Sequence, residues 1–353
     1  MGREGKYPWQ AVFQISRFSA LLVVIFYCYV QLLEVETVET SKQRSEYEPV
    51  VPIGSISAAF VYLGNEKHFG ADRDRESCRS IYDSLKSLSL HFIPADDSSK
   101  TFPLMDLSVI LLYDGELSNS TRLALTNASP FPLYFHEILF IQPRDEKWAN
   151  ESNVSYKRMC AFWFHYFFEL DFLPDYVMRL DTDSCLVSDM DTNPFRYMYE
   201  NQIEYMYHSV FDEPFDVIED LQNFTSHHPG QSVNTTTNNA LTLWLETSML
   251  VFSTNLEWFY IPAFRRPHIL EWKDQVRHHG GVFRHRWGDA PLRTIVAANL
   301  FNSSRISRFC SFAYNHSCWE TFKACTQEED FLVNKFGWRI VYHDLTMNTS
   351  VVA

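Results

Sequence analysis

Two aspartates separated by one residue directly follow a short apolar segment of this chain. The segment is Tyr176–Leu180, and the aspartates are Asp181 and Asp183. Carboxylates at i and i+2 at the end of a strand emerge on one side, which suits a shared divalent metal ion. Such an ion neutralises a leaving diphosphate and keeps coordination positions for phosphate oxygens. By itself, the same motif is also typical of a solvated acidic turn.

A second polar motif lies further along the chain. Residues 280–291 read Gly-Gly-Val-Phe-Arg-His-Arg-Trp-Gly-Asp-Ala-Pro. Arg286 and Asp289 stand in this glycine-containing loop, and their side chains suit sugar hydroxyls or phosphate. Packing explains Trp287 and a turn explains Gly288 equally well, so the motif leaves a structural role open.

Both motifs resemble those of the yeast-type α-1,2-mannosyltransferase family. The run YVMRLDTDSCLVSDMDTNPFRYM (176–198) is similar to a family signature with an arginine, a metal-binding acidic residue and a later Asp-x-Asp-x-[Asp/Asn]-Pro-Phe. Residues 280–291 are similar to the family's Gly-Gly-Phe-x-x-x-Arg-Trp-Gly-Asp-Ala-Pro element, and 314–316 to its Tyr-His-His segment. Residues 156–168 and 201–207 also resemble family segments, so the likeness covers roughly residues 55–345.

The resemblance implies a GT-A-like fold, GDP-mannose as donor, Mn²⁺ as metal and retention of anomeric configuration. It implies a Golgi-type glycosyltransferase that moves mannose to a mannose-containing N- or O-linked glycan acceptor on secretory proteins. It makes Asp181 and His316 the metal ligands, since a neutral imidazole beside a carboxylate suits Mn²⁺. Glu246 and Asp289 are the expected catalytic residues. The residues expected to bind substrate are Arg179, Asp183, Tyr205, Tyr207, Arg286 and Trp287.

The catalytic role of Glu246 depends on the alignment. Family members carry a glutamate in a Trp-Ser-Asn-Phe-Glu-Ile segment, and direct alignment on Trp244 puts Ser248 at its place. Glu246 lies two residues earlier, and a two-residue slip keeps the same strand face. A surface glutamate before a buried strand explains Glu246 equally well. Front-face attack, in which a carboxylate only stabilises positive charge, is a further possibility.

Two other departures concern the metal site. The family often has Glu-Pro where this chain has Asp181-Thr182, which keeps the carboxylate but shortens its reach. Asn315 begins a glycosylation sequon directly before His316. Two alternatives therefore stay open: a catalytically silent glycan-binding protein on the same fold, and a transferase with another nucleotide-sugar donor.

The elements expected around these residues alternate between strands and helices. This order predicts an α/β fold with a mixed, mainly parallel sheet and ligands at the carboxyl ends of its strands. The expected strands are Ile56–Leu63, Leu107–Tyr113, Tyr134–Ile141 and Tyr176–Leu180, and the expected helices are Glu76–Leu90 and Met159–Phe172.

The N-terminal part of the chain differs from the rest. No charge interrupts residues 18–33, while Arg3, Lys6 and Arg17 precede this apolar stretch and glutamates follow it. The pattern predicts a cytoplasmic tail (1–7), a transmembrane signal-anchor (8–33), a lumenal stem (34–54) and a catalytic domain (55–353). A cleaved signal peptide is the alternative. The expectation is a single-pass type II protein of the Golgi membrane.

Composition agrees with a lumenal domain. The formal net charge of −14 argues against nucleic-acid binding, which needs a basic face. Of the seven cysteines, Cys28 lies in the apolar stretch, and disulfides or buried thiols explain the other six. Glycosylation sequons begin at Asn119, Asn127, Asn150, Asn153, Asn223, Asn234, Asn302, Asn315 and Asn348.

Overall fold

The computed structural model divides the chain into two units, residues 1–50 and 51–353. It describes residues 56–69, 78–92, 105–143, 146–149, 152–190, 192–214, 217–228, 250–317, 320–323 and 339–341, all in the second unit. The expected tail, anchor and stem lie outside these residues, as do Glu246 and Asp191. Within the described ranges, no helix is both long and apolar enough to cross a membrane.

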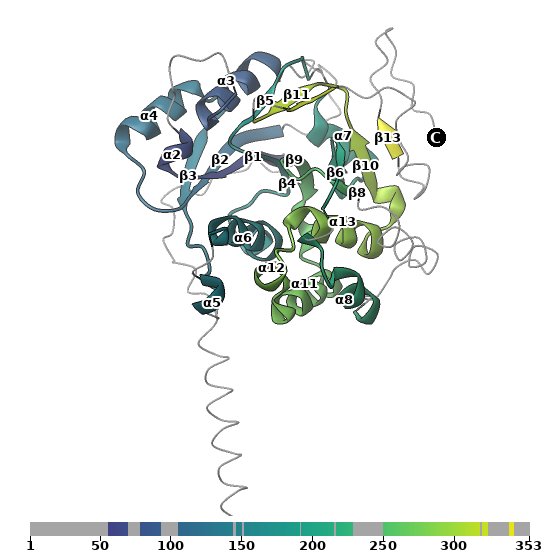
Figure 1. Cartoon of the computed structure of the whole chain (residues 1–353). Coiled ribbons are helices and arrows are strands. Elements are labelled where there is room, and N and C mark those ends of the chain that lie inside the picture. Colours follow the sequence, from purple (N-terminus) through teal and green to yellow (C-terminus); the bar gives the residue numbers. More distant parts are fainter. Residues whose placement is uncertain are drawn as a thin grey trace, which may run out of the picture. The chain divides into compact units, whose positions relative to one another are not determined.

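The centre of the second unit is a mixed sheet, which has eight strands among the described residues in the order β13-β10-β6-β9-β4-β1-β2-β3 (Figure 1). Neighbouring strands run parallel except β9, which is antiparallel to β4 and β6. The predicted mainly parallel sheet is therefore confirmed. The strands are β1 (Ile56–Gly64), β2 (Met105–Tyr113), β3 (Leu133–Glu137), β4 (Tyr176–Leu180), β6 (Tyr205–Tyr207), β9 (Leu256–Tyr260), β10 (Ile306–Phe309) and β13 (Arg339–Val341).

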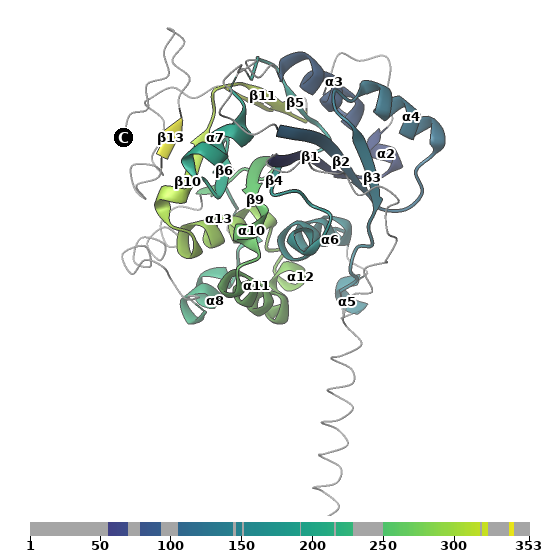
Figure 2. The same cartoon turned by 180° about the vertical axis from the view of Figure 1, so that it is seen from behind.

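Helices cover both faces of this sheet (Figures 1 and 2). One face packs against α3 (Ile81–His91), α4 (Asn119–Ala128) and α7 (Pro194–Asn201). The other packs against α6 (Val154–Ala161), the helical turns η1 (Phe162–Tyr166) and η2 (Phe167–Glu169), α8 (Leu221–His227), α10 (Ile261–Phe264), α11 (Pro267–His279), α12 (Gly281–Arg284) and α13 (Asp289–Leu300). Two short helices, α2 (Glu66–Phe69) and α5 (Glu146–Ala149), follow β1 and β3 along the chain.

Side chains of β1 show why its sequence is mainly apolar. Phe60 and Tyr62 enter the core under α3, whereas Ala59 and Val61 enter the core under α6 and α13. Successive residues of a strand point to opposite faces, and both faces are covered here. The sequence of the strand is therefore a continuous apolar run.

Element boundaries differ from the sequence-based expectations where caps or aromatic packing intervene. Helix α3 begins at Ile81, later than expected, because Ser80 caps it by accepting a hydrogen bond from the amide of Asp83. The aromatic helix expected at 159–172 begins earlier, at Val154, and continues beyond Ala161 as a π-helical and then a 3₁₀ turn ending at Glu169. Strand β3 ends at Glu137, before the expected end at Ile141, and Figure 1 shows it at the edge of the sheet.

Two small sheets complete the fold. In one, β5 (Ser184–Leu186) and β12 (Glu320–Phe322) both pair antiparallel with β11 (Tyr314–His316). In the other, β7 (Val210–Asp212) pairs antiparallel with β8 (Leu250–Phe252). Because β5 begins three residues after Asp181, its pairing with β11 decides what lies beside the acidic motif.

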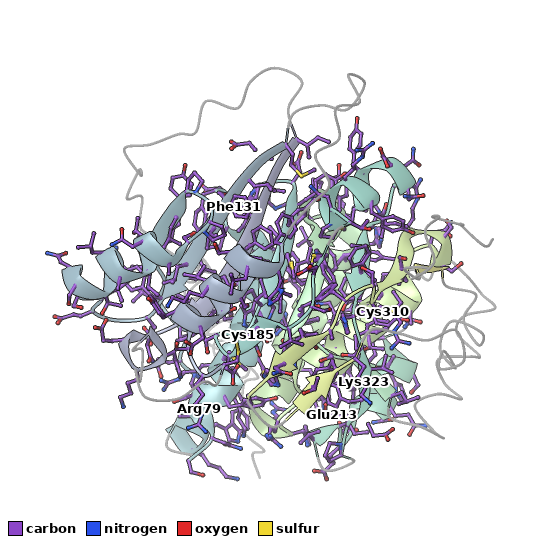
Figure 3. All side chains as sticks on the ribbon, turned by 90° about the horizontal axis from the view of Figure 1, so that it is seen from above. Arg79, Phe131, Cys185, Glu213, Cys310 and Lys323 are labelled. Carbon is purple, nitrogen blue, oxygen red and sulfur yellow. A yellow bond between two sulfur atoms is a disulfide. The ribbon has the colours of Figure 1, made fainter. Side chains whose placement is uncertain are left out.

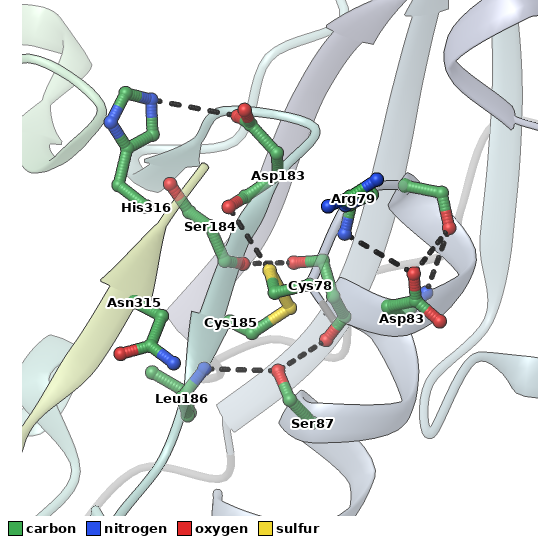
Figure 4. Close-up of a disulfide and its surroundings, with 12 residues drawn as sticks. Cys78, Arg79, Asp83, Ser87, Asp183, Ser184, Cys185, Leu186, Asn315 and His316 are labelled. Carbon is green, nitrogen blue, oxygen red and sulfur yellow. Dashed lines mark hydrogen bonds and ion pairs between the residues drawn. A yellow bond between two sulfur atoms is a disulfide. The ribbon is translucent and has the colours of Figure 1, made fainter. Parts of the chain in front are cut away.

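A disulfide fixes β5 to the segment before α3. Cys78 and Cys185 form a disulfide across a sequence separation of 107 residues (Figure 4). Such a disulfide typically stabilises the folded state by about 2–4 kcal/mol. Cys310 is also disulfide-bonded and lies apart from Cys185 (Figure 3), whereas Cys160 is a buried free thiol. These described cysteines thus show both states expected from the sequence.

Candidate active site

The acidic motif is an ordered turn between the large sheet and the small one. The amide of Asp181 donates to the carbonyl of Asn255 at 2.9 Å, and the amide of Ser184 donates to the carbonyl of Asp181 at 3.0 Å. The side chains of Asp181 and Asp183 are 27% and 29% exposed. Both carboxylates thus lie in partly buried positions at the carboxyl end of β4, rather than in a fully solvated turn.

His316 reaches this turn through strand pairing. Residue His316 of β11 lies opposite Ser184 of β5, next to the motif. Its Nε2 lies 3.5 Å from Asp183 Oδ1 and 3.8 Å from Asp181 Oδ2, and Figure 4 shows the imidazole turned toward Asp183. The predicted ligands Asp181 and His316 are thus brought together, and Asp183 joins them.

These three side chains fit a divalent ion in their chemistry. In the part of the chain that the structure describes, no three His, Cys, Asp or Glu side chains form a ready-made metal cage. Carboxylates are donors that suit Mn²⁺, and a neutral imidazole is a reasonable further ligand beside them. Burial raises the pKa of Asp181 although Arg179 and His316 act to lower it. A bound cation would favour the ionised carboxylate at this position.

A buried arginine, Arg179, lies on the interior side of the acidic motif and donates hydrogen bonds to it. Arg179 of β4 is 1% exposed, and its guanidinium lies 4.2 Å from the ring centroid of Trp163. Its Nε and Nη2 donate to Asp181 Oδ1 at 3.3 and 3.1 Å, while its Nη1 donates to Glu257 Oε1 at 3.1 Å and also to Asp289 Oδ2. One arginine thus contacts three carboxylates, Asp181, Glu257 and Asp289. The excess of negative charge favours binding of a metal ion on the side of Asp181 that faces His316.

Asp289 begins helix α13, with Gly288 as the residue before the first turn. Burial acts to raise its pKa, but the charge and hydrogen bond of Arg179 together with the charge of Arg293 outweigh burial, and the pKa lies below its usual value. An ionised aspartate in the first turn also interacts favourably with the helix dipole. Asp289 therefore contributes a fixed negative charge next to the acidic motif, and its predicted catalytic role stays a prediction.

The other predicted site residues are divided between surface and core. Arg286 is exposed, has a positive φ of 61°, and lies 4.9 Å from the ring centroid of Tyr156. Trp287 is fully buried and stacks on His279 with ring centroids 4.7 Å apart. A Cβ on Gly281 would lie 2.1 Å from the indole ring, so only glycine fits there. The packing interpretation of Trp287 therefore agrees with its position, and its predicted contact with substrate stays a prediction.

Tyr205 and Tyr207, also expected to bind substrate, both lie in the core on β6. The hydroxyl of Tyr205 donates to Glu257 Oε2 at 2.9 Å. In this structure Tyr205 thus supports the charged network, and neither tyrosine lines a surface. Their binding of substrate stays a prediction.

Sequence reasoning missed two members of the network, Glu257 and Arg293. Glu257 is fully buried on β9, and Arg293 Nε makes an ion pair with its Oε2 at 3.4 Å. Each is a single charged residue within an otherwise uncharged run, Leu256–Tyr260 for Glu257 and 290–300 for Arg293. A charge buried in this way needs a partner, and that was the signal available in the sequence.

A mainly parallel sheet with an acidic motif at the carboxyl end of β4 and a histidine beside it fits a metal-dependent transferase. The sequence profile of the glycolipid 2-α-mannosyltransferase family matches residues 137–336. The chain belongs to this family.

Relatives and solved structures agree with this assignment. The chain is 28% identical over 335 residues to the α-1,2-mannosyltransferase KTR1 of Saccharomyces cerevisiae, covering 85% of this chain and 83% of the relative. It is 25% identical to the glycolipid 2-α-mannosyltransferase of the same yeast, covering 56% of this chain and about half, 49%, of that relative's length.

Two crystal structures show the same fold. Core-mannan synthase A (CmsA/Ktr4) from Aspergillus fumigatus, in an Mn/GDP form, matches with a TM-score of 0.59 and 16% identity, covering 77% of this chain and 79% of that one. The mannosyltransferase Ktr4p from S. cerevisiae, in complex with GDP, matches with a TM-score of 0.61 and 19% identity, covering 81% and 78%. The fold predicted from the family resemblance is thus confirmed for the described part of the chain.

Proposed function

We propose that this chain is a retaining α-1,2-mannosyltransferase that moves mannose from GDP-mannose to a mannose-containing glycan on secretory proteins. The observation that carries the proposal is the convergence of Asp181, Asp183 and His316 in front of the buried Arg179. Family membership and the names of the relatives, which are α-1,2- and glycolipid mannosyltransferases, support the donor and the linkage. The similar core-mannan synthase A, whose crystal structure is an Mn/GDP form, supports the metal and the nucleotide.

In this proposal each residue has a separate task. Asp181 and His316 would hold Mn²⁺, with Asp183 beside them, and the ion when bound would supply the positive charge that neutralises the diphosphate of the donor. Arg179 occupies Asp181 Oδ1, which leaves Oδ2 on the side of His316. Asp289 adds negative charge near the site of glycosyl transfer, where positive charge develops on the sugar. The carboxylate nearest the anomeric carbon is proposed to be Glu246, as the family resemblance implies.

A donor screen tests this function directly. We expect nucleotide release with GDP-mannose, Mn²⁺ and an oligomannose acceptor to exceed release with UDP-glucose or UDP-galactose by at least about 100-fold, since a site that hydrogen-bonds its substrate can discriminate by up to about 10⁴- to 10⁵-fold. Released GDP or UDP is measured by a coupled luminescence assay, with the Asp181→Asn variant as background. Preference for a UDP-sugar would refute the donor assignment. Glycan binding without turnover of any donor would instead support a silent glycan-binding protein.

We also propose that the chain is a type II protein of the Golgi membrane with its catalytic domain in the lumen. The uncharged residues 18–33 and the basic residues before them support this orientation. Several sequon asparagines are exposed on the folded domain and can accept glycans, namely Asn119, Asn127, Asn223 and Asn302.

The topology predicts that endoglycosidase treatment of the full chain produces a clear downward mobility shift. The protein should also stay in the membrane pellet after alkaline carbonate washing, because a spanning helix is held by apolar burial. Replacing the four exposed asparagines by glutamine should reduce the shift. An unchanged mobility together with full solubility would disprove the membrane and Golgi assignments.

A further inference from the structure

Glu257 is completely buried, and all its described partners carry a charge or a hydroxyl. Its Oε1 accepts a hydrogen bond from Arg179 at 3.1 Å, and its Oε2 accepts one from Tyr205 at 2.9 Å. Arg293, also buried, completes the set with an ion pair at 3.4 Å. Burying a carboxylate costs several kcal/mol unless such partners compensate it, so the arrangement calls for an explanation beyond packing.

Sheet register places Glu257 directly beside the arginine of the active site. In the antiparallel pair of β4 and β9, Glu257 is the partner of Arg179. The guanidinium uses Nε and Nη2 for Asp181, and Nη1 for Glu257 and Asp289. Every nitrogen of the guanidinium thus has a fixed direction, and Glu257 defines the side facing away from the acidic motif.

We propose that Glu257 is a positioning residue of the metal site, which acts through Arg179 to orient the carboxylate of Asp181 toward His316. This inference rests on the proposed function, because it assigns Asp181 and His316 as metal ligands. Glu257 does not touch the metal or the substrate. It balances part of the positive charge of Arg179, so that the guanidinium competes less with a dication for Asp181.

Replacing Glu257 by glutamine removes this balance but keeps the size of the side chain. Of its described anionic partners, Arg179 then keeps Asp181 and Asp289, and its ion pair with Asp181 becomes stronger. Loss of a residue behind a metal ligand typically costs 10- to 100-fold in metal affinity or activity. We therefore expect the Kd for Mn²⁺ to rise about 10-fold and kcat to fall by about 10- to 100-fold in E257Q, with the KM for the glycan acceptor unchanged.

The experiment measures Mn²⁺ binding to the purified lumenal domain from the electron paramagnetic resonance signal of the unbound ion, which requires no donor. The matched control is Glu204→Gln, because Glu204 is also a buried carboxylate but pairs with a different arginine, Arg266, at 2.6 and 2.8 Å. E204Q should lose stability but keep the wild-type Kd. Glu257→Asp, which keeps the charge, should restore the affinity to within about 3-fold of wild type.

A wild-type Kd for Mn²⁺ in E257Q, with a loss of stability like that of E204Q, would overturn the proposal. If E257Q does not fold, Tyr205→Phe decides, since it removes the hydrogen bond that holds Oε2 of Glu257 and so loosens the orientation of this carboxylate toward Arg179. Its control is Tyr62→Phe, because buried Tyr62 also makes one hydroxyl contact, with Ser84 at 3.0 Å. A higher Kd in Y205F than in Y62F supports the proposal, and equal values overturn it.

Failure of the proposed function has a different result. In that case E257Q still weakens Mn²⁺ binding relative to E204Q, but no nucleotide sugar supports transfer by the wild-type chain. The positioning role and the identity of the donor are therefore decided by separate measurements.

Discussion

Replacing Asp181 with asparagine is expected to lower kcat by at least about 1000-fold, which corresponds to about 4 kcal/mol of lost transition-state stabilisation. The asparagine keeps the shape and can still accept hydrogen bonds from Arg179, so the fold should be retained. The negative charge that faces His316 is lost, and the Kd for Mn²⁺ should rise in parallel. Steady-state kinetics with GDP-mannose and a Mn²⁺ titration measure both effects.

Asp183→Asn is the matched comparison for this variant, because it changes the neighbouring carboxylate in the same turn. Asp183 accepts a hydrogen bond from Ser317 and lies near His316, whereas Asp181 is the carboxylate that Arg179 holds. We expect a smaller loss of kcat than in D181N. Full activity of D181N with unchanged Mn²⁺ dependence would show that Asp181 does not bind the metal.

Arg179→Met should produce the largest loss of stability, about 3–5 kcal/mol in the free energy of unfolding. The substitution leaves Glu257, Asp289 and Asp181 without the buried cation that joins them. Urea denaturation followed by tryptophan fluorescence measures the loss. The control is Arg196→Met, because Arg196 makes a partly exposed i,i+4 pair with Glu200 and such pairs contribute only about 0.3–0.5 kcal/mol.

The loss in R179M should also depend on pH. Burial already raises the pKa of Glu257 to about 7, although Arg293 and Arg179 act to lower it. Without Arg179 this pKa rises further, and the pKa of Asp289 rises with it. When the pKa of a carboxyl group is higher in the folded than in the unfolded state, the free energy of unfolding decreases as the pH rises from the unfolded to the folded pKa. The deficit of R179M should therefore be smaller at pH 5 than at pH 8, and a deficit independent of pH would contradict this account.

The sequence by itself determined the main strands and the positions of the two motifs. β1, β2 and β4 are short apolar runs, and the strand Tyr176–Leu180 was predicted with its observed boundaries. Such runs are recognisable because strands covered on both faces need apolar side chains at every position. Asp181 and His316 could be named as a pair from the family resemblance, and the structure places them 3.8 Å apart.

Tertiary structure alone decided which charges meet in the core. Arg179 and Glu257 are 78 residues apart, and only the register of β4 against β9 makes them neighbours. Local sequence carries no record of that register, because it is set by packing of both sheet faces and by the strands on either side. For the same reason, only the fold shows that Tyr205 donates to Glu257 and that Trp287 packs against Phe224 of α8, although packing was one role the sequence left open for Trp287. The sequence therefore identified Asp181 and His316, which face the site. The fold revealed the buried ion pair of Arg179 and Glu257 beside them.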